Sequence, residues 1–145
     1  MSIRPQYARA IMVGRKKFEL RRIHAAPLIE EGSIIVVYAS GSVKSIIGEF
    51  KAKRVLQSTP ERIWALTSGS KTGIGEDAWQ YIKGARRAMA IEVGERRLYE
   101  RPVTLDEIRR VIPGWNPPFS YTLLEEGDPL LELVLKRVRA RYQTL

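Results

Sequence analysis

The stretch GRKKFELR, residues 14–21, carries the clearest local pattern of the chain. Phe18 and Leu20 fall on one face of an extended segment and Glu19 and Arg21 on the other, because successive side chains of a strand point to opposite faces. The stretch therefore predicts a half-buried strand with an apolar inner face and a charged outer face.

The residues before this strand predict a short helix. Pro5 suits the first turn of a helix, and Tyr7 and Ile11 recur at helical spacing. Gly14 is a natural end for that helix, because glycine adopts the left-handed conformation that closes many helices. A helix that ends there places Lys16 at the junction of helix and strand, beside the last helical carbonyl groups.

The rest of the chain predicts further short strands and helices. Strands are expected near Ile3 and at 34–39, 43–57, 87–93, 96–100 and 119–124, and helices are expected to open at Pro60, Glu76, Thr104 and Pro129. Because strands and helices do not alternate regularly, the order favours an α+β fold with a mainly antiparallel sheet or barrel.

Three local signals sharpen these boundaries. Gly48 interrupts the 43–57 strand and predicts a bulge or a close approach of another backbone. Ser58 and Glu61 fit a capping box ahead of the helix at Pro60, and Thr104 and Glu107 fit a second box.

Composition bounds the class of protein. The chain has 145 residues, enough for one domain, with no cysteine and a single histidine, His24. Disulfides, cysteine nucleophiles and His-rich metal sites are therefore excluded, and we expect neither a metal nor another cofactor. The chain has no apolar run long enough to span a membrane and no signal-peptide pattern at Met1, so we expect a cytoplasmic protein without a membrane partner.

The positive charge is concentrated near one end of the chain. The formal net charge is +9, from 25 basic and 16 acidic residues. Residues 1–22 hold seven basic residues and one acidic residue, a net charge of +6. A basic excess of this size favours polyanions as partners, and its position directs attention to the 14–21 stretch.

The same stretch resembles a known family. Gly14, Lys16, Glu19 and Arg21 form the pattern G-x-K-x-x-E-x-R, which resembles the ASCH domain, a PUA-like β-barrel family linked to RNA binding. The runs VYAS at 37–40, VKSIIGEF at 43–50 and PPFSY at 117–121 support the resemblance, although family members often carry glutamine at the position of Phe119.

The resemblance implies both a fold and a division of the chain. It spans residues 1–124 and implies a PUA-like, mainly antiparallel β-barrel with short helices around it. Residues 125–145 lie outside the resemblance and are expected to form a C-terminal helical extension.

The function that the resemblance implies is nucleic-acid binding in a basic cleft, with RNA favoured over DNA and a regulatory role in transcription or RNA metabolism. The charged strand face would line a cleft between the first helix and the barrel. A carboxylate between two cations can hold their side chains in place while leaving donors free for a phosphate or a base edge. We expect phosphates at Lys16, Lys17, Arg21 and Lys44, and one nucleotide in a pocket of Glu19, Ser40 and Tyr121.

An enzyme is the alternative, and it would be a hydrolase. Some relatives hydrolyse acylated cytidine with a lysine and a threonine three residues later, but Glu19 stands at that threonine position here. A carboxylate cannot replace the hydroxyl nucleophile, so that mechanism does not transfer. Lys16 and Glu19 would instead move protons in the hydrolysis of a modified nucleoside or of RNA. With a plain ion pair as the simpler interpretation, the sequence favours a binding module over an enzyme.

The C-terminal helix allows two arrangements. Leucine and valine surround its first half, which requires burial either on its own domain or against another chain. A homodimer through residues 128–142, or an adaptor that binds another protein there, stays open beside docking on the same chain.

Overall fold

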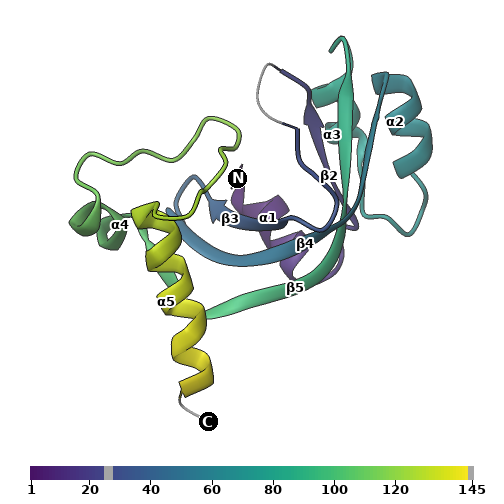
Figure 1. Ribbon diagram of the computed structural model, residues 1–145. Coiled ribbons are helices and arrows are strands. Elements are labelled where there is room, and N and C mark those ends of the chain that lie inside the picture. The colour runs from purple at the N-terminus through teal and green to yellow at the C-terminus, as the bar shows by residue number, and fades with distance from the viewer. Residues whose placement is uncertain (25–27, 144–145) are drawn as a thin grey trace.

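The computed structural model describes residues 1–24 and 28–143, and it contains one five-stranded sheet (Figure 1). The strands follow the order β1 (Ser2–Ile3), β3 (Ile34–Ala39), β4 (Ser45–Ser58), β5 (Ala88–Thr104) and β2 (Phe18–Arg22). β1 runs parallel to β3, and the other neighbouring strands are antiparallel. The predicted α+β class with a mainly antiparallel sheet is confirmed.

Two long, curved strands, β4 and β5, form the centre of the fold (Figure 1). The register between them shifts at Gly48, where an added Cβ would lie 2.4 Å from the carbonyl oxygen of Arg97. Only glycine allows the backbones to approach so closely, so the predicted irregularity at Gly48 is confirmed. The two strands expected at 87–93 and 96–100 form a single strand, because β5 continues through Gly94 and pairs with β4 on both sides of it.

Among the described residues, five helices connect and cover the strands: α1 (Pro5–Met12), α2 (Pro60–Thr67), α3 (Glu76–Ile82), α4 (Leu105–Val111) and α5 (Pro129–Gln143). The Thr104 hydroxyl accepts a hydrogen bond from the backbone N–H of Glu107, as predicted. The cap of α2 differs by one residue from the prediction. Thr59, not Ser58, is the N-cap residue, because its hydroxyl accepts a hydrogen bond from the backbone N–H of Arg62 at 3.3 Å.

The sheet does not close into the barrel that we expected, because β1 and β2 remain separate edges. Closure would need a backbone ladder between them, but β1 has only two residues. The expected strand at 119–124 is irregular instead, and Pro117 and Pro118 before it have no N–H to donate to a ladder. We call the opening between β1 and β2 the seam.

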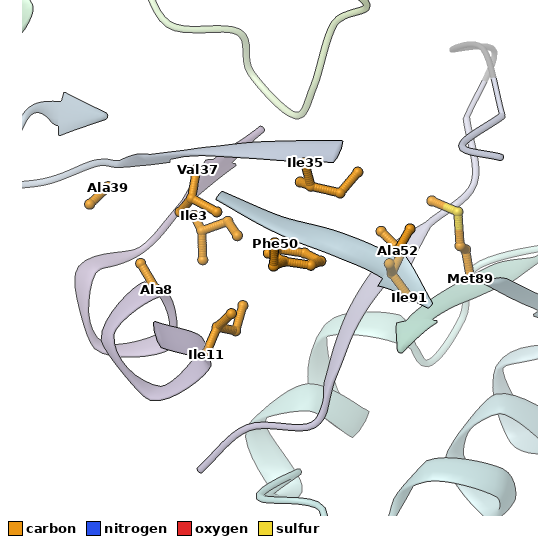
Figure 2. Close-up of a cluster of buried hydrophobic side chains, with 10 residues drawn as sticks. All are labelled: Ile3, Ala8, Ile11, Ile35, Val37, Ala39, Phe50, Ala52, Met89 and Ile91. Carbon is orange, nitrogen blue, oxygen red and sulfur yellow. The ribbon is translucent and has the colours of Figure 1, made fainter. Parts of the chain in front are cut away.

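Three apolar clusters hold the fold together. The first lies between α1 and the sheet, with Ile3, Ile11, Phe50 and Ile91 at its centre (Figure 2). The second lies under α4 and α5, and the third lies under α2 and α3. Phe18 and Leu20 belong to the third cluster, so the apolar face of β2 packs on α2 and α3 and its charged face turns toward the seam.

The C-terminal helix docks on its own chain. Leu130 and Val134 of α5 are buried in the second cluster. Arg137 donates to the carbonyl oxygens of Arg101 and Pro102 at 2.7 and 2.8 Å and forms an ion pair with Glu107. These contacts bury one side of the apolar half of α5 without a second chain.

Candidate functional site

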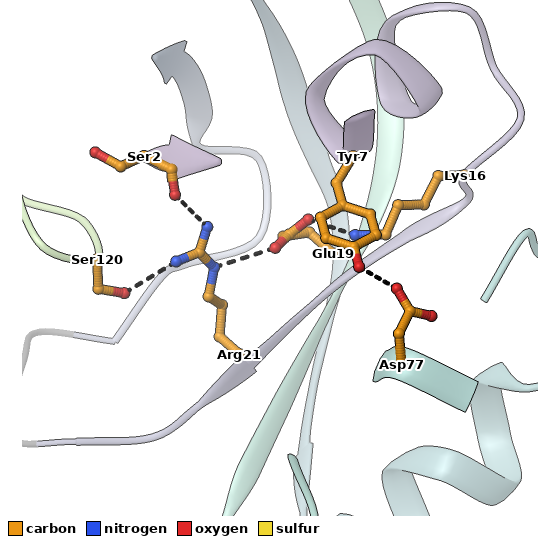
Figure 3. A network of polar contacts seen from close by, with 7 residues as sticks. All are labelled: Ser2, Tyr7, Lys16, Glu19, Arg21, Asp77 and Ser120. Carbon is orange, nitrogen blue, oxygen red and sulfur yellow. Dashed lines mark hydrogen bonds and ion pairs between the residues drawn. The ribbon is translucent and has the colours of Figure 1, made fainter. Parts of the chain in front are cut away.

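Lys16, Glu19 and Arg21 form a buried charge cluster at the seam (Figure 3). Lys16 Nζ lies 2.7 Å from one oxygen of the Glu19 carboxylate, and Arg21 Nε lies 3.2 Å from the other. Only 8%, 5% and 7% of these three residues, respectively, is exposed. The cluster carries a net charge of +1 away from solvent, so it differs from a surface ion-pair ladder, which contributes little.

Arg21 also spans the seam. Its Nη2 donates to the carbonyl oxygen of Ser2 in β1 at 2.7 Å, and its Nη1 donates to Ser120 Oγ at 3.2 Å. Ser2 in turn bonds the irregular segment: its N–H donates to Ser120 O at 2.9 Å, and its hydroxyl donates to Pro118 O at 2.7 Å. One side chain thereby connects the two sheet edges that the backbone leaves apart.

Tyr7 of α1 covers Lys16 on the opposite side of the cluster (Figure 3). The Lys16 ammonium lies 5.0 Å from the centre of the Tyr7 ring, a favourable cation–π arrangement. The Tyr7 hydroxyl donates to the Asp77 carboxylate at the start of α3, and this hydrogen bond raises the pKa of Tyr7. Three elements, α1, β2 and α3, thus meet around the lysine.

The loop between α2 and α3 packs against the junction that holds Lys16. The backbone N–H of Lys17 donates to Thr72 O at 2.8 Å. Gly73 has φ +74°, and an added Cβ would lie 2.1 Å from the carbonyl oxygen of Arg15. The loop fits there because this position has no side chain. It thereby supports the backbone just before Lys16.

The cluster retains unused hydrogen-bond donors. The contacts above use one of the three ammonium hydrogens of Lys16 and three of the five guanidinium N–H groups of Arg21. Glu19 holds both cations through its two oxygens, so their positions are set before any ligand arrives. The arrangement can present further N–H donors to a phosphate oxygen or a base edge.

The other predicted site residues have different positions. Tyr121 lies close to Arg21: burial raises the pKa of Tyr121 and the guanidinium opposes that rise. Ser40 lies on the far side of β1, where its hydroxyl donates to Ile3 O at 3.3 Å. Lys17 and Lys44 are exposed, and Lys44 has φ +46° in the turn before β4. Tyr121 therefore lies within the electrostatic influence of the cluster, whereas the cluster's hydrogen bonds and ion pairs among the described residues do not include Lys17, Ser40 or Lys44.

Four residues around the cluster have no counterpart in the predicted site: Ser2, Tyr7, Asp77 and Ser120. The spacing of Tyr7 and Ile11 predicted the helix but carried no signal for a role of Tyr7 at the site. Ser120 lies within the PPFSY run that supported the family resemblance, so its position carried a signal. Asp77 carried none, because its partner lies 70 residues away in the chain.

A mainly apolar pocket of about 720 Å³ adjoins the seam. It lies between α5 and strands β3 and β4, and Met1, Pro118 and Tyr121 line the side nearest the charge cluster. Glu49 brings a carboxylate into the lining and accepts a hydrogen bond from Tyr99 at 2.7 Å.

The described part of the chain offers neither a metal site of carboxylates and histidines nor a membrane-spanning helix. Residues 1–24 and 28–143 contain no cluster of three acidic or histidine side chains that could hold a metal ion. Over the same ranges, no helix combines the length and apolar character needed to cross a bilayer.

Comparison with known proteins points to one family. The ASCH domain model matches residues 1–94. A curated relative, an ASCH domain-containing ribonuclease from Zymomonas mobilis, is 30% identical over 136 residues, which cover 92% of this chain and 89% of the relative. The crystal structure of ASCH from Zymomonas mobilis superimposes with a TM-score of 0.79 at 28% identity, over 93% of this chain and 92% of that one. A serine-to-alanine mutant of that protein gives a TM-score of 0.80 at 27% identity, over 94% and 93% of the two chains.

Proposed function

Because this chain belongs to the ASCH domain family, we propose that it binds RNA at the seam between β1 and β2. The observation that carries the proposal is the buried Lys16–Glu19–Arg21 cluster. Two cations held by one carboxylate form a fixed set of donors in the seam, and such donors suit the oxygens of phosphates and bases.

Unpaired RNA fits this site better than a duplex does. Sequence-specific RNA recognition uses single-stranded bases that stack on aromatic rings and bond through their edges. Tyr121 directly follows Ser120, whose hydroxyl accepts a hydrogen bond from Arg21, and the Tyr7 ring lies 5.0 Å from the Lys16 ammonium. One splayed nucleotide would therefore meet an aromatic ring and a charged donor at either end of the cluster. RNA is favoured over DNA because the relative from Zymomonas mobilis is named a ribonuclease.

Exposed cations would hold the RNA backbone outside the seam. We assign this role to Lys17 and Lys44, which are both exposed, and we place Ser40 at the rim beyond β1. Residues 1–124 would form the RNA-binding unit. Residues 125–145 would support it from outside, since α5 covers the second apolar cluster rather than the seam.

RNA cleavage is the second candidate function, and the relative's ribonuclease activity favours it. In such a reaction Glu19 would accept the proton of a ribose 2′-hydroxyl as that oxygen bonds to phosphorus. Lys16 would donate a proton to the 5′-oxygen as its bond to phosphorus breaks, and Arg21 would stabilise the added negative charge. Lys16 and Glu19 are paired with each other at 2.7 Å, so this reaction requires the phosphodiester to enter between them.

A binding titration tests the main proposal. Fluorescently labelled single-stranded RNA and DNA of one sequence would be titrated with the wild type, with Lys16→Ala and with the exposed control Lys136→Ala. Affinity for RNA should exceed that for DNA and should fall steeply between about 50 and 200 mM salt. Lys16→Ala should weaken binding by roughly 1–3 kcal/mol, and Lys136→Ala should not. If affinity changes neither with salt nor in Lys16→Ala, and circular dichroism shows that this variant is folded, the seam is excluded as the RNA-binding site.

A further inference from the structure

A second group of positive side chains lies at the far end of β2, on the face opposite the seam. Arg22 is the last residue of β2, and its Nη2 lies 3.5 Å from the carbonyl oxygen of Lys83, which follows α3. The backbone N–H of Ile23 donates to Arg87 O at 3.1 Å. These contacts bring together four residues, which we call the β2-end cluster: Arg22, Lys83, Arg86 and Arg87.

Within residues 1–24 and 28–143, the charges of the β2-end cluster have no carboxylate partner. None of the ion pairs that the structure describes involves any of the four residues. Arg22 Nε is buried and has no hydrogen-bond partner within the described residues. A buried donor without a partner carries a desolvation cost of about 1–3 kcal/mol, which a bound oxygen atom would offset.

Other cations on the same sheet show a different arrangement. Arg54 and Lys53 of β4 lie 3.1 and 3.9 Å from the carboxylate of Glu92. One carboxylate therefore offsets part of their charge within the chain. The β2-end cluster holds three exposed cations, Lys83, Arg86 and Arg87, around the half-buried Arg22, and no ion pair among the described residues offsets any of this charge. An unbalanced group of like charges favours an anionic partner.

We infer that the β2-end cluster binds the phosphates that flank the nucleotide held at the seam. The inference rests on the proposed function, which it extends to a longer RNA. β2 is an edge strand, with Arg21 on its seam face and Arg22 on its opposite face. An RNA strand that crosses the free edge of β2 therefore meets Arg21 first and the β2-end cluster next.

The test compares a short and a longer RNA, each with variants that remove positive charge from two different places. Arg86→Gln/Arg87→Gln removes two charges of the cluster. The matched control Arg110→Gln/Lys136→Gln removes two exposed charges from α4 and α5, at the opposite end of the molecule (Figure 1). Both variants and the wild type would be titrated with a dinucleotide and with a single-stranded RNA of about 12 nucleotides at several salt concentrations.

For the longer RNA, Arg86→Gln/Arg87→Gln should weaken binding about tenfold at low salt and reduce the salt slope by about 1.4, since each phosphate contact to a single strand contributes about 0.7. Dinucleotide affinity should stay at the wild-type value, and the control variant should bind both RNAs as the wild type does. An equal loss in both variants, or a loss that includes the dinucleotide, overturns the inference and leaves the seam proposal standing. A wild type that binds neither RNA overturns the proposed function itself.

Discussion

Arg21 Nη2 donates to the carbonyl oxygen of Ser2 at 2.7 Å, so one side chain connects the two edge strands of the sheet. A closed barrel would join those edges through backbone hydrogen bonds and would leave no opening. Here the opening contains a buried carboxylate with a cation on either side. The incomplete sheet and the candidate site are therefore one feature of the molecule.

Arg21→Ala should destabilise the protein by about 3–5 kcal/mol, because it removes one partner of a buried ion pair and leaves polar groups of the seam without a donor. Urea unfolding followed by circular dichroism measures this change. The exposed control Arg110→Ala should shift the free energy of unfolding by less than about 0.5 kcal/mol. A shift for Arg21→Ala as small as that of the control would contradict the role of Arg21 in joining the edges.

Glu19→Gln separates binding from cleavage, because the amide keeps the shape of the side chain and loses its charge. If the protein only binds RNA, neither protein should cleave it, and affinity should fall in Glu19→Gln because the amide holds Lys16 and Arg21 less firmly than the carboxylate does. If it cleaves RNA with Glu19 as the base, cleavage should fall by roughly 10²–10⁴-fold, well beyond the loss in affinity. Gel analysis of end-labelled RNA, beside a binding titration, gives both values. If the cleavage rate is unchanged in Glu19→Gln, Glu19 is not the general base.

Tyr7 and Asp77 should contribute to stability through a single shared hydrogen bond. Tyr7→Phe keeps the ring beside Lys16 but removes the hydrogen bond to Asp77, and we expect a loss of about 0.5–1.5 kcal/mol in stability. Asp77→Asn tests the same bond from the other side. In the double variant the two losses should not add, because both changes remove one interaction. Full additivity in a thermodynamic cycle would show that the two side chains are independent.

Gly73→Ala and Gly114→Ala form a matched pair, with φ +74° and +77°. Both changes strain the backbone by about 1 kcal/mol. At Gly73 the new Cβ also meets the Arg15 carbonyl oxygen, whereas nothing lies within 4 Å of a Cβ at Gly114. Gly73→Ala should therefore cost a further 1–3 kcal/mol or so and weaken RNA binding, since the loop supports the backbone before Lys16. Equal melting temperatures for the two variants would contradict this packing.

Deletion of residues 128–145 should expose the second apolar cluster. Leu130 and Val134 together bury two large aliphatic side chains there, which corresponds to roughly 3–6 kcal/mol of transfer free energy. We expect a large fall in the melting temperature. Light scattering on the full chain addresses the homodimer predicted through residues 128–142, and a monomeric mass at working concentration would exclude it.

Much of the fold could be predicted because its signals are local. Alternating side chains predicted β2, and caps and prolines predicted the starts of α1, α4 and α5. The grouping of Lys16, Glu19 and Arg21 was predictable for the same reason, since all three lie within six residues of one another. Side chains this close in the chain, at a junction of helix and strand, can adopt few backbone arrangements that keep them apart.

Features that depend on distant segments could not be predicted in this way. Tyr7 and Asp77 are 70 residues apart, and Arg21 and Ser120 are 99 residues apart. No local pattern determines which of many exposed polar residues will meet across such intervals. The position of Ser40 also depends on a distant segment, because its hydroxyl donates to Ile3 O and β1 thereby lies between Ser40 and the charge cluster.

The sequence by itself determined that the chain would pack one antiparallel sheet with short helices, because periodicity, capping residues and turn residues act over a few neighbours. It also determined that two cations would share one carboxylate. Only the tertiary structure decided that the sheet stays open, because closure depends on whether strands from distant parts of the chain are long enough to pair. With β1 limited to two residues, Arg21 bridges the opening, and the charge cluster lies at the seam.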